Sequence, residues 1–256
     1  MGLIISVLNQ KGGVGKTTTA INLSAALAIL EKKVLLIDAD PQANSTSGVG
    51  LEQDTVNTSI YDCLLNNLDI KKAIFATSTP NLSIIPSNDA LADTEINLVH
   101  LPQREKALKH VLEPIKDDFD FIIIDCPPSL GLTIINALTA SDSVIVAIQC
   151  EFYALEGLSK LLQTIKIIKE RFNPVIDIEG FLLTMYDPRT RLQRQVAAEV
   201  EDHFGNLVFK TRITRNVKLA EAPSHGKHIF DYDITSPGAQ SYLALAREIL
   251  QNNELT

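Results

Sequence analysis

Six short apolar runs, each separated from the next by a segment long enough for a helix, constrain the fold of this chain more than any other feature. Most of the runs are continuous stretches of Ile, Val and Leu, which is typical of strands that are covered on both faces. Helical periodicity fills most of the intervening segments, and this alternation predicts an α/β fold with a doubly wound, mostly parallel sheet and helices on both faces. The expected strands are 3–8, 33–37, 82–85, 121–124, 143–148 and 178–184, and the expected helices are 17–30, 101–112, 132–140 and 155–171.

The last third of the chain is less regular. Its pattern predicts helices over 193–204 and 241–250 and a strand over 207–213. The chain has 256 residues, of which 45% are hydrophobic, and this is enough to build a full core. Because the sequence contains no internal repeat, low-complexity tract or linker rich in Pro, Gly or Ser, we expect a single domain over residues 1–256.

Charge and hydropathy exclude several classes of protein. The net charge of −8 and the isoelectric point of about 5.1 exclude a protein that is basic over its whole surface, so a contact with nucleic acid requires a local patch. No apolar run approaches the roughly 18–20 residues that span a bilayer. The three cysteines are widely spaced and include no C-x-x-C pair, which indicates reduced thiols. Together these features predict a cytoplasmic protein.

A glycine-rich segment with two lysines follows the first expected strand and opens the first expected helix. Residues 10–19 read QKGGVGKTTT. Glycines allow backbone N–H groups to turn toward phosphates, and a helix N-terminus adds its positive end. In such a loop Lys16 would reach the β- and γ-phosphates and the Thr17 hydroxyl would bind Mg²⁺. The residues expected to hold the nucleotide are Lys11, Gly12, Gly13, Val14, Gly15, Lys16, Thr17 and Thr18.

Acidic residues end two other expected strands. Residues 38–42 read DADPQ, and residues 121–129 read FIIIDCPPS. Carboxylates at i and i+2 of a strand face the same side, but Pro41 ends this strand, so Asp38 and Asp40 can diverge. Ligands bind at the carboxyl ends of strands in sheets of this type. We therefore expect Asp38, Asp40 and Asp125 to lie beside the phosphate loop.

These motifs carry a specific resemblance. A loop with Gln10 in place of the first glycine and with the additional Lys11 resembles the deviant Walker A motif of the ParA/MinD ATPase superfamily. The DADPQ segment resembles the switch I of that superfamily, and the strand ending in DCPP resembles its Walker B and switch II segment. The resemblance extends from residue 3 to about residue 250 and implies a P-loop ATPase with ATP and Mg²⁺ as cofactors.

The resemblance also implies roles for individual residues. Lys11 would reach across a nucleotide-sandwich homodimer to the partner's phosphates and stabilise the transition state in trans, as an arginine finger does. Asp40 would orient or activate the attacking water. The catalytic residues are thus Lys11, Lys16 and Asp40. The Mg²⁺ shell would comprise Thr17, Asp38 and Asp125, the carboxylates acting through water.

Two later segments extend the match. Residues 184–190 (TMYDPRT) resemble the loop that closes over the adenine, and residues 213–226 (ITRNVKLAEAPSHG) resemble a run of chromosomal ParA proteins. The resemblance implies that Met185 and Asn216 contact the nucleotide. Because the phosphate loop opens at residue 10, we expect the short chromosomal form, without an N-terminal helix-turn-helix domain.

A basic cluster interrupts the acidic chain. Residues 186–230 contain eight Lys and Arg against five Asp and Glu. Such a local cluster suits contacts with a phosphate backbone that require two subunits together. An ordinary solvated surface is the alternative interpretation. The resemblance assigns the DNA contacts to Arg189 and Lys218, with Arg191 and Arg215 as further candidates.

These observations lead to one main hypothesis: an ATP-driven switch of DNA segregation. ATP would drive a homodimer that binds double-stranded DNA of the nucleoid without sequence preference, and a ParB-like centromere-binding protein would stimulate hydrolysis and release it. A ParA-like positioner of another cargo is an alternative. A MinD-like, membrane-cycling division regulator is disfavoured because residues 246–256 (AREILQNNELT) contain one basic residue and no long apolar face, so we expect no stable membrane association.

Overall fold

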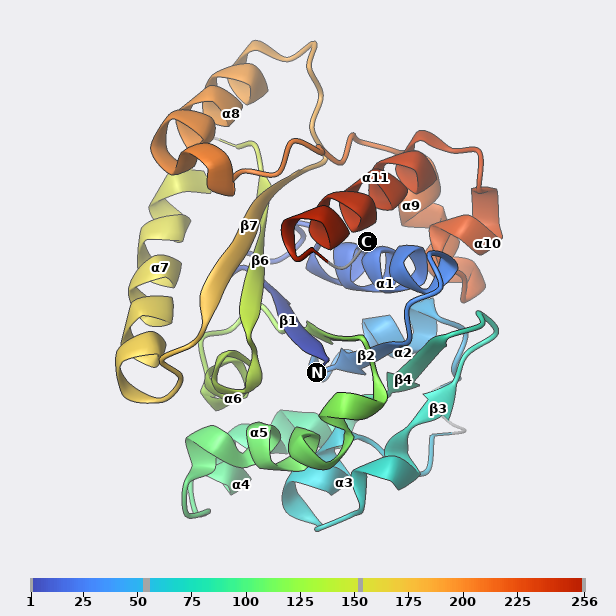
Figure 1. Cartoon of the computed structure of the whole chain (residues 1–256), viewed down its shortest axis with the longest axis vertical. Helices are drawn as coiled ribbons and strands as arrows, with labels where there is room; N and C mark the ends of the chain where they lie inside the picture. The colour runs from blue at the N-terminus through green and yellow to red at the C-terminus, as the bar shows by residue number, and fades with distance from the viewer. Residues whose placement is uncertain (1, 53–55, 152–153, 255–256) are drawn as a thin grey trace.

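A single sheet of seven strands forms the centre of the computed structural model, which describes residues 2–52, 56–151 and 154–254. The strands are β1 (Leu3–Leu8), β2 (Val34–Asp38), β3 (Phe75–Ala76), β4 (Leu82–Ile85), β5 (Phe121–Asp125), β6 (Ser143–Gln149) and β7 (Asp177–Thr184). Their order across the sheet is β3-β4-β2-β5-β1-β6-β7 (Figure 1). All neighbouring pairs are parallel except β3 with β4 at one edge. The predicted doubly wound, mostly parallel sheet is confirmed.

Helices cover both faces of this sheet. Within the described residues the α-helices are α1 (Lys16–Ile29), α2 (Asn44–Gly48), α3 (Ile60–Leu65), α4 (Thr94–Leu98), α5 (Ala107–Leu112), α6 (Leu132–Ala140), α7 (Ala154–Arg171), α8 (Arg191–Phe204), α9 (Val217–Glu221), α10 (Ile229–Asp233) and α11 (Pro237–Asn252). Helices α1 and α11 lie on one face, and α6 and α7 lie on the other (Figure 1).

The strands bury alternate residues in two separate cores. In β1, Ile4 and Leu8 belong to the core beneath α6 and α7, whereas Ile5 and Val7 belong to the core beneath α1 and α11. The other central strands divide in the same way. A strand that faces helices on both sides needs apolar residues at every position, which is why these runs are continuous.

The predicted strand over 207–213 is wrong. The segment follows β7 at isolated points only, where Phe209 N–H donates to Phe181 O at 3.1 Å and Ile213 N–H donates to Leu183 O at 2.9 Å. Between these points the carboxylate of Glu248, on α11, accepts the backbone N–H groups of Lys210 and Thr211 at 2.7 and 3.0 Å. Because Glu248 takes these donors, no continuous ladder forms.

The predicted helix over 101–112 begins too early. Gln103 has a left-handed φ of 54°, and a short 3₁₀ helix, Arg104–Lys106, precedes α5. Pro102 and this left-handed residue prevent regular helix before residue 104. The antiparallel edge strand β3 was not predicted either, because two residues leave no detectable pattern.

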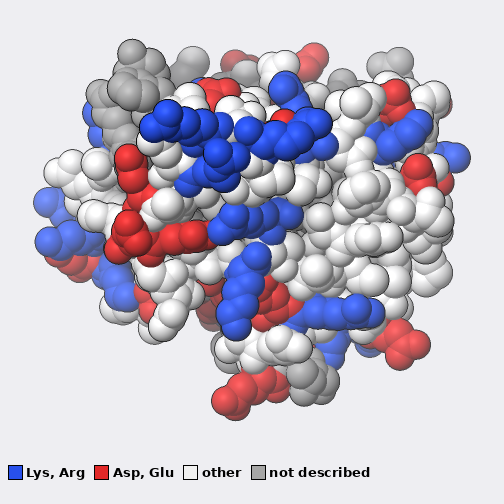
Figure 2. Space-filling model, turned by 90° about the horizontal axis from the view of Figure 1, so that it is seen from above, with Lys and Arg blue, Asp and Glu red and all other residues white. Residues whose placement is uncertain are grey.

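Basic side chains gather on one side of the molecule. Figure 2 looks down on the side that carries α8 and the loop before it, at the top of Figure 1, and shows Lys and Arg side chains in a band across that face. This end of the molecule is therefore basic, although the whole chain is acidic.

Candidate nucleotide-binding site

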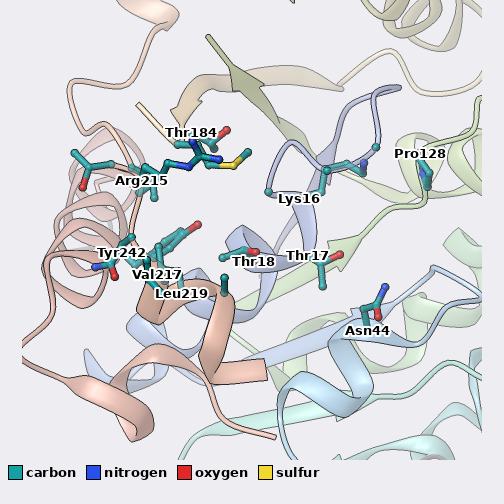
Figure 3. A pocket seen from close by; sticks show the side chains of 18 of the residues that line it. Lys16, Thr17, Thr18, Asn44, Pro128, Thr184, Arg215, Val217, Leu219 and Tyr242 are labelled. Carbon is teal, nitrogen blue, oxygen red and sulfur yellow. The ribbon is translucent and has the colours of Figure 1, made fainter. Parts of the chain in front are cut away.

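A cavity of about 650 Å³ opens at the carboxyl ends of the central strands. One end is polar and is formed by the phosphate loop, whereas the other is mainly apolar and is formed by residues that follow β7 and begin α9 (Figure 3). Polar at one end and apolar at the other, the cavity suits a molecule with phosphates and a flat ring. Its lining comprises Gly12, Gly13, Gly15, Lys16, Thr17, Thr18, Asp40, Gln42, Asn44, Pro128, Thr184, Met185, Ile213, Thr214, Arg215, Asn216, Val217, Leu219, Ala220 and Tyr242.

The phosphate loop is shaped by glycines in conformations that other residues avoid. Gly13 and Gly15 have φ angles of +73° and +88°. A Cβ added to Gly12 or Gly13 would meet nothing within 4 Å, so the loop borders open space at these two positions. Helix α1 begins directly after Gly15 without a side-chain cap and without an acidic residue in its first turn. Its first N–H groups and its positive end are therefore available to an anion.

Lys16 is held at the polar end of the cavity. The side chain is only 6% exposed, and its Nζ donates to the Lys11 carbonyl at 3.0 Å. Burial lowers the pKa of Lys16, and the nearby charge of Asp125 opposes this shift. From the other side of the cavity, the Thr184 hydroxyl donates to the Val14 carbonyl at 2.7 Å and attaches the loop to the end of β7.

Asp125 offers the atoms that a divalent cation needs. It ends β5 fully buried, and its Oδ2 accepts the Ser45 hydroxyl at 2.7 Å. The Thr17 side chain lies close enough to oppose the rise of its pKa. Its Oδ1 has no hydrogen-bond partner in the part of the chain that the structure describes. A buried carboxylate oxygen without a partner, next to a threonine hydroxyl at a helix N-terminus, fits Mg²⁺ or a water of its shell.

Asp38 is directly opposite Asp125 on the neighbouring strand, but its contacts differ. Its Oδ2 accepts both the backbone N–H and the hydroxyl of Thr46, each at 2.8 Å, and its Oδ1 accepts the Asp40 N–H at 3.2 Å. Burial raises the pKa of both carboxyls, and each is further raised by an acidic neighbour. Because both oxygens of Asp38 are occupied, the geometry favours Asp125 and Thr17 as metal ligands, and a metal role for Asp38 remains a prediction.

Asp40 lies in the turn that leaves β2 and lines the cavity. It is 8% exposed, and its Oδ1 accepts the Gln42 N–H at 3.0 Å. Asp38 and Asp40 thus diverge after the strand ends: the first holds α2, and the second faces the cavity. The sequence left this divergence open, and Ser45 and Thr46, which attach α2 to the two acids, were missed.

Helix α2 also contacts a distant turn. Gly48 packs against Ile21 of α1, and a Cβ on Gly50 would lie 2.9 Å from the carbonyl oxygen of Gly226. Both Gly50 and Gly226 have positive φ, +89° and +62°. Gly226 ends the 3₁₀ helix Ala222–His225, which directly follows α9. The backbone that follows α2, the helix attached to Asp38 and Asp125, is therefore in direct contact with the backbone of the turn after α9.

Lys11 is not among the residues that line the cavity. Its side chain is 49% exposed and pairs with the carboxylate of Glu151, just after β6. The base of this loop is attached to the same strand end, because Asn9 Nδ2 donates to the Ala147 carbonyl at 2.6 Å and Asn9 Oδ1 accepts the Lys11 N–H at 3.0 Å. The Lys11 side chain is therefore engaged with Glu151, outside the lining of the cavity.

The two residues expected to contact the nucleotide base come together at the apolar end. Met185 has a left-handed φ of 49°, and Asn216 caps α9 by accepting the Lys218 N–H at 2.8 Å; both line the cavity. Arg215, a candidate for DNA contact, lines the same cavity. Arg189, Arg191 and Lys218 are outside its lining and exposed.

Known proteins share this arrangement. The family model of an AAA domain matches residues 2–178. The sporulation initiation inhibitor protein Soj of Bacillus subtilis is 55% identical over 98% of this chain and 100% of its own length. The chromosome partitioning protein ParA of Myxococcus xanthus is 49% identical over 99% and 89%. The crystal structure of cobyrinic acid a,c-diamide synthase from Mycobacterium smegmatis, with a bound ATP analogue and magnesium, superposes with a TM-score of 0.87 at 35% identity and covers 99% of this chain and 96% of that one.

Fold and site together define a P-loop ATPase with a second lysine in its phosphate loop. ATP and Mg²⁺ are its cofactors. Within this class, the chain belongs to the Soj/ParA family of chromosome-partitioning ATPases.

Proposed function

We propose that this protein is an ATP-dependent switch of DNA segregation. Mg-ATP drives two subunits into a nucleotide-sandwich dimer that binds DNA without sequence preference, and hydrolysis to ADP and phosphate, stimulated by a ParB-like centromere-binding partner, releases it. The observation that carries the proposal is the position of Lys11, outside its own cavity but beside a complete phosphate site. A lysine in this position can act on the phosphates of a second subunit.

Residues in and around the cavity have separate roles in the proposed reaction. Lys16 and the free N–H groups of α1 bind the β- and γ-phosphates, and Thr17 with Asp125 would hold Mg²⁺, which neutralises phosphate charge. Asp40 orients the attacking water, and Lys11 of the other subunit stabilises the charge that develops in the transition state.

The expected DNA surface comprises Arg189, Arg191 and Lys218. The Arg189 guanidinium pairs with Asp187 at 2.9 Å, and this pairing holds the pKa of Asp187 at about 2, while Lys218 pairs with Glu221 at 3.1 Å. Exposed pairs of this kind contribute little to stability. DNA phosphates can therefore replace the carboxylates at small cost, and the basic band of Figure 2 lies on the side that carries the loop of Arg189.

The nucleoid within the cytoplasm is the proposed location, because a DNA-bound dimer accumulates there. A ParA-like positioner of another cargo would use the same chemistry with a different partner. For the membrane-cycling alternative, the described residues contain no helix that is long and apolar enough to cross a bilayer.

Action of Lys11 in trans has a direct test. We expect Lys11→Ala to bind ATP normally but to hydrolyse it about 10²–10³-fold more slowly, because one donor to the developing charge is lost. Lys16 keeps its hydrogen bond in this variant, because its acceptor is the backbone carbonyl of residue 11. ATPase rates are measured for Lys11→Ala, for Asp40→Ala and for an equal mixture.

In a mixed dimer, the subunit with alanine at position 11 keeps Asp40 and receives Lys11 from its partner. Random pairing then restores about a quarter of the wild-type rate, because half of the dimers are mixed and each has one complete site. A mixture as inactive as the two variants alone would show that Lys11 acts within its own subunit.

DNA binding is expected to depend on ATP and on salt. Asp40→Ala protein should shift an unrelated duplex with ATP, but not with ADP or without nucleotide. If a dimer contacts about six phosphates, raising salt from 50 to 200 mM should weaken binding by roughly three decades. Arg189→Ala in the same background should weaken binding to all sequences and reduce the salt slope. If ATP still dimerises the protein and DNA is ignored in every state, the basic band is an ordinary surface.

A further inference from the structure

Arg215 occupies an unexpected position for a residue of the basic cluster. Its side chain lines the nucleotide cavity at the end opposite Lys16, next to Thr184, as Figure 3 shows. Val217 and Leu219 line the same end. A guanidinium beside apolar side chains, at the end of the cavity opposite Lys16, lies where a base rather than a phosphate would bind.

The guanidinium of Arg215 has no carboxylate partner among the described residues, whereas three other cations of the segment are paired. Arg189 pairs with Asp187, Arg212 pairs with Glu201, and Lys218 pairs with Glu221. Among the residues that the structure describes, no ion pair or side-chain hydrogen bond engages Arg215, although its charge contributes to lowering the pKa of Asp187. Arg215 is therefore the cation of this segment that remains available to a ligand in the cavity.

The backbone fixes where this side chain begins. The Tyr186 N–H donates to the Ile213 carbonyl at 2.9 Å, and the Arg215 N–H donates to the Tyr186 carbonyl at 3.3 Å. These two hydrogen bonds hold residue 215 beside residues 185–186, so that Arg215 and Met185 border the apolar end of the cavity together. The backbone of residue 215 is therefore held in place by hydrogen bonds.

We propose that Arg215 stacks its guanidinium on the face of the adenine ring and is a nucleotide-positioning residue rather than a DNA contact. The proposal rests on the assignment of this cavity to ATP, and it is independent of DNA binding. A planar, weakly hydrated guanidinium stacks on aromatic rings more readily than an ammonium does. ATP and ADP share the adenine, so Arg215 contributes equally to the binding of both.

The test separates the base from the phosphates. Affinities for Mg-ATP, Mg-ADP and Mg-tripolyphosphate are measured by competition with a fluorescent ATP analogue, for the wild type, Arg215→Ala and Arg215→Lys. Arg215→Ala should weaken ATP and ADP by the same factor, about 3- to 30-fold, and leave tripolyphosphate unchanged. Arg215→Lys keeps the charge but not the plane, so it should show most of the same loss. Arg194→Ala, which removes an exposed arginine of the same cluster outside the cavity, should change none of the three affinities.

Four results would overturn the proposal. Unchanged nucleotide affinity in Arg215→Ala would remove Arg215 from the site. An equal loss for ATP and tripolyphosphate, or full rescue by lysine, would assign it to the phosphates. A smaller salt slope of DNA binding with normal ATP affinity would return it to the DNA surface. Failure of the proposed function is distinguishable, because wild-type protein would then bind Mg-ATP without dimerising or without binding DNA.

Discussion

Asp40→Ala is expected to lower ATP hydrolysis about 10²- to 10⁴-fold while ATP binding stays within a few-fold of the wild type. Asp40 lines the cavity but supports only the local turn, through Gln42 N–H at 3.0 Å, so its removal leaves the phosphate loop intact. The attacking water loses the group that orients it. The dimer should therefore accumulate with ATP, which is measured by light scattering after size-exclusion chromatography.

Lys16→Ala provides the matched contrast. Lys16 is the buried cation of the phosphate site, so its loss should abolish ATP binding, dimerisation and DNA binding together. Binding of DNA by Lys16→Ala irrespective of nucleotide would contradict the coupling between the two activities. Wild-type hydrolysis by Asp40→Ala would remove Asp40 from the catalytic residues.

Replacement by asparagine is expected to change the melting temperature in opposite directions at the two buried aspartates, Asp125 and Asp38. Asp125→Asn should raise the melting temperature of the nucleotide-free protein by about 2–4 °C, corresponding to about 1 kcal/mol. The substitution removes a buried charge next to Asp38 and keeps the Ser45 hydrogen bond on the amide oxygen. We expect this gain to outweigh the cost of an NH₂ group that, like Oδ1, has no partner among the described residues. Asp38→Asn should lower the melting temperature by about 5–10 °C, because an NH₂ group would face donors that now bind the carboxylate, and a buried donor without an acceptor costs about 1–3 kcal/mol.

The pH dependence gives an independent check of this pair. Burial raises the pKa of Asp125 above its unfolded value, so its ionisation costs the folded state stability as the pH rises above about 4. The advantage of Asp125→Asn should therefore disappear in acid and grow toward alkaline pH. Calorimetry with and without Mg-ATP completes the test, since Asp125→Asn should lose the stabilisation that Mg-ATP gives to the wild type. A lower melting temperature for Asp125→Asn would contradict the conclusion that burial disfavours the charge of Asp125.

The sequence predicts the part of the fold that is determined by local pattern. Continuous apolar runs identify β1, β2 and β5 because strands buried on both faces need them, and the glycines and Lys16 identify the loop between β1 and α1. The segment 207–213 has a strand-like composition and still forms no strand. A carboxylate from α11, nearly forty residues away, takes its backbone donors, and no local pattern reports this.

The candidate site also contains residues that the sequence predicts and contacts that it does not. Met185 and Asn216 were found through a resemblance of whole segments, and both line the cavity. The attachment of Ser45 to Asp125, and of Thr184 to the phosphate loop, joins residues 80 and 170 positions apart. A polar residue at the end of an apolar strand was the available signal for Thr184. Arg215 was grouped with the basic cluster because composition cannot tell which side of a segment faces a cavity.

Because Gly50 and Gly226 are in direct backbone contact, we expect α2 and the turn after α9 to move together. Side chains at an interface can change rotamer and absorb a displacement, but two backbones in direct contact have no such slack. We therefore expect a movement of α2, imposed at the acidic residues, to reach the segment that carries Lys218. Thermodynamic linkage makes this influence mutual: a ligand that prefers one position of α9 changes the affinity for the nucleotide by the same factor as the nucleotide changes the affinity for that ligand.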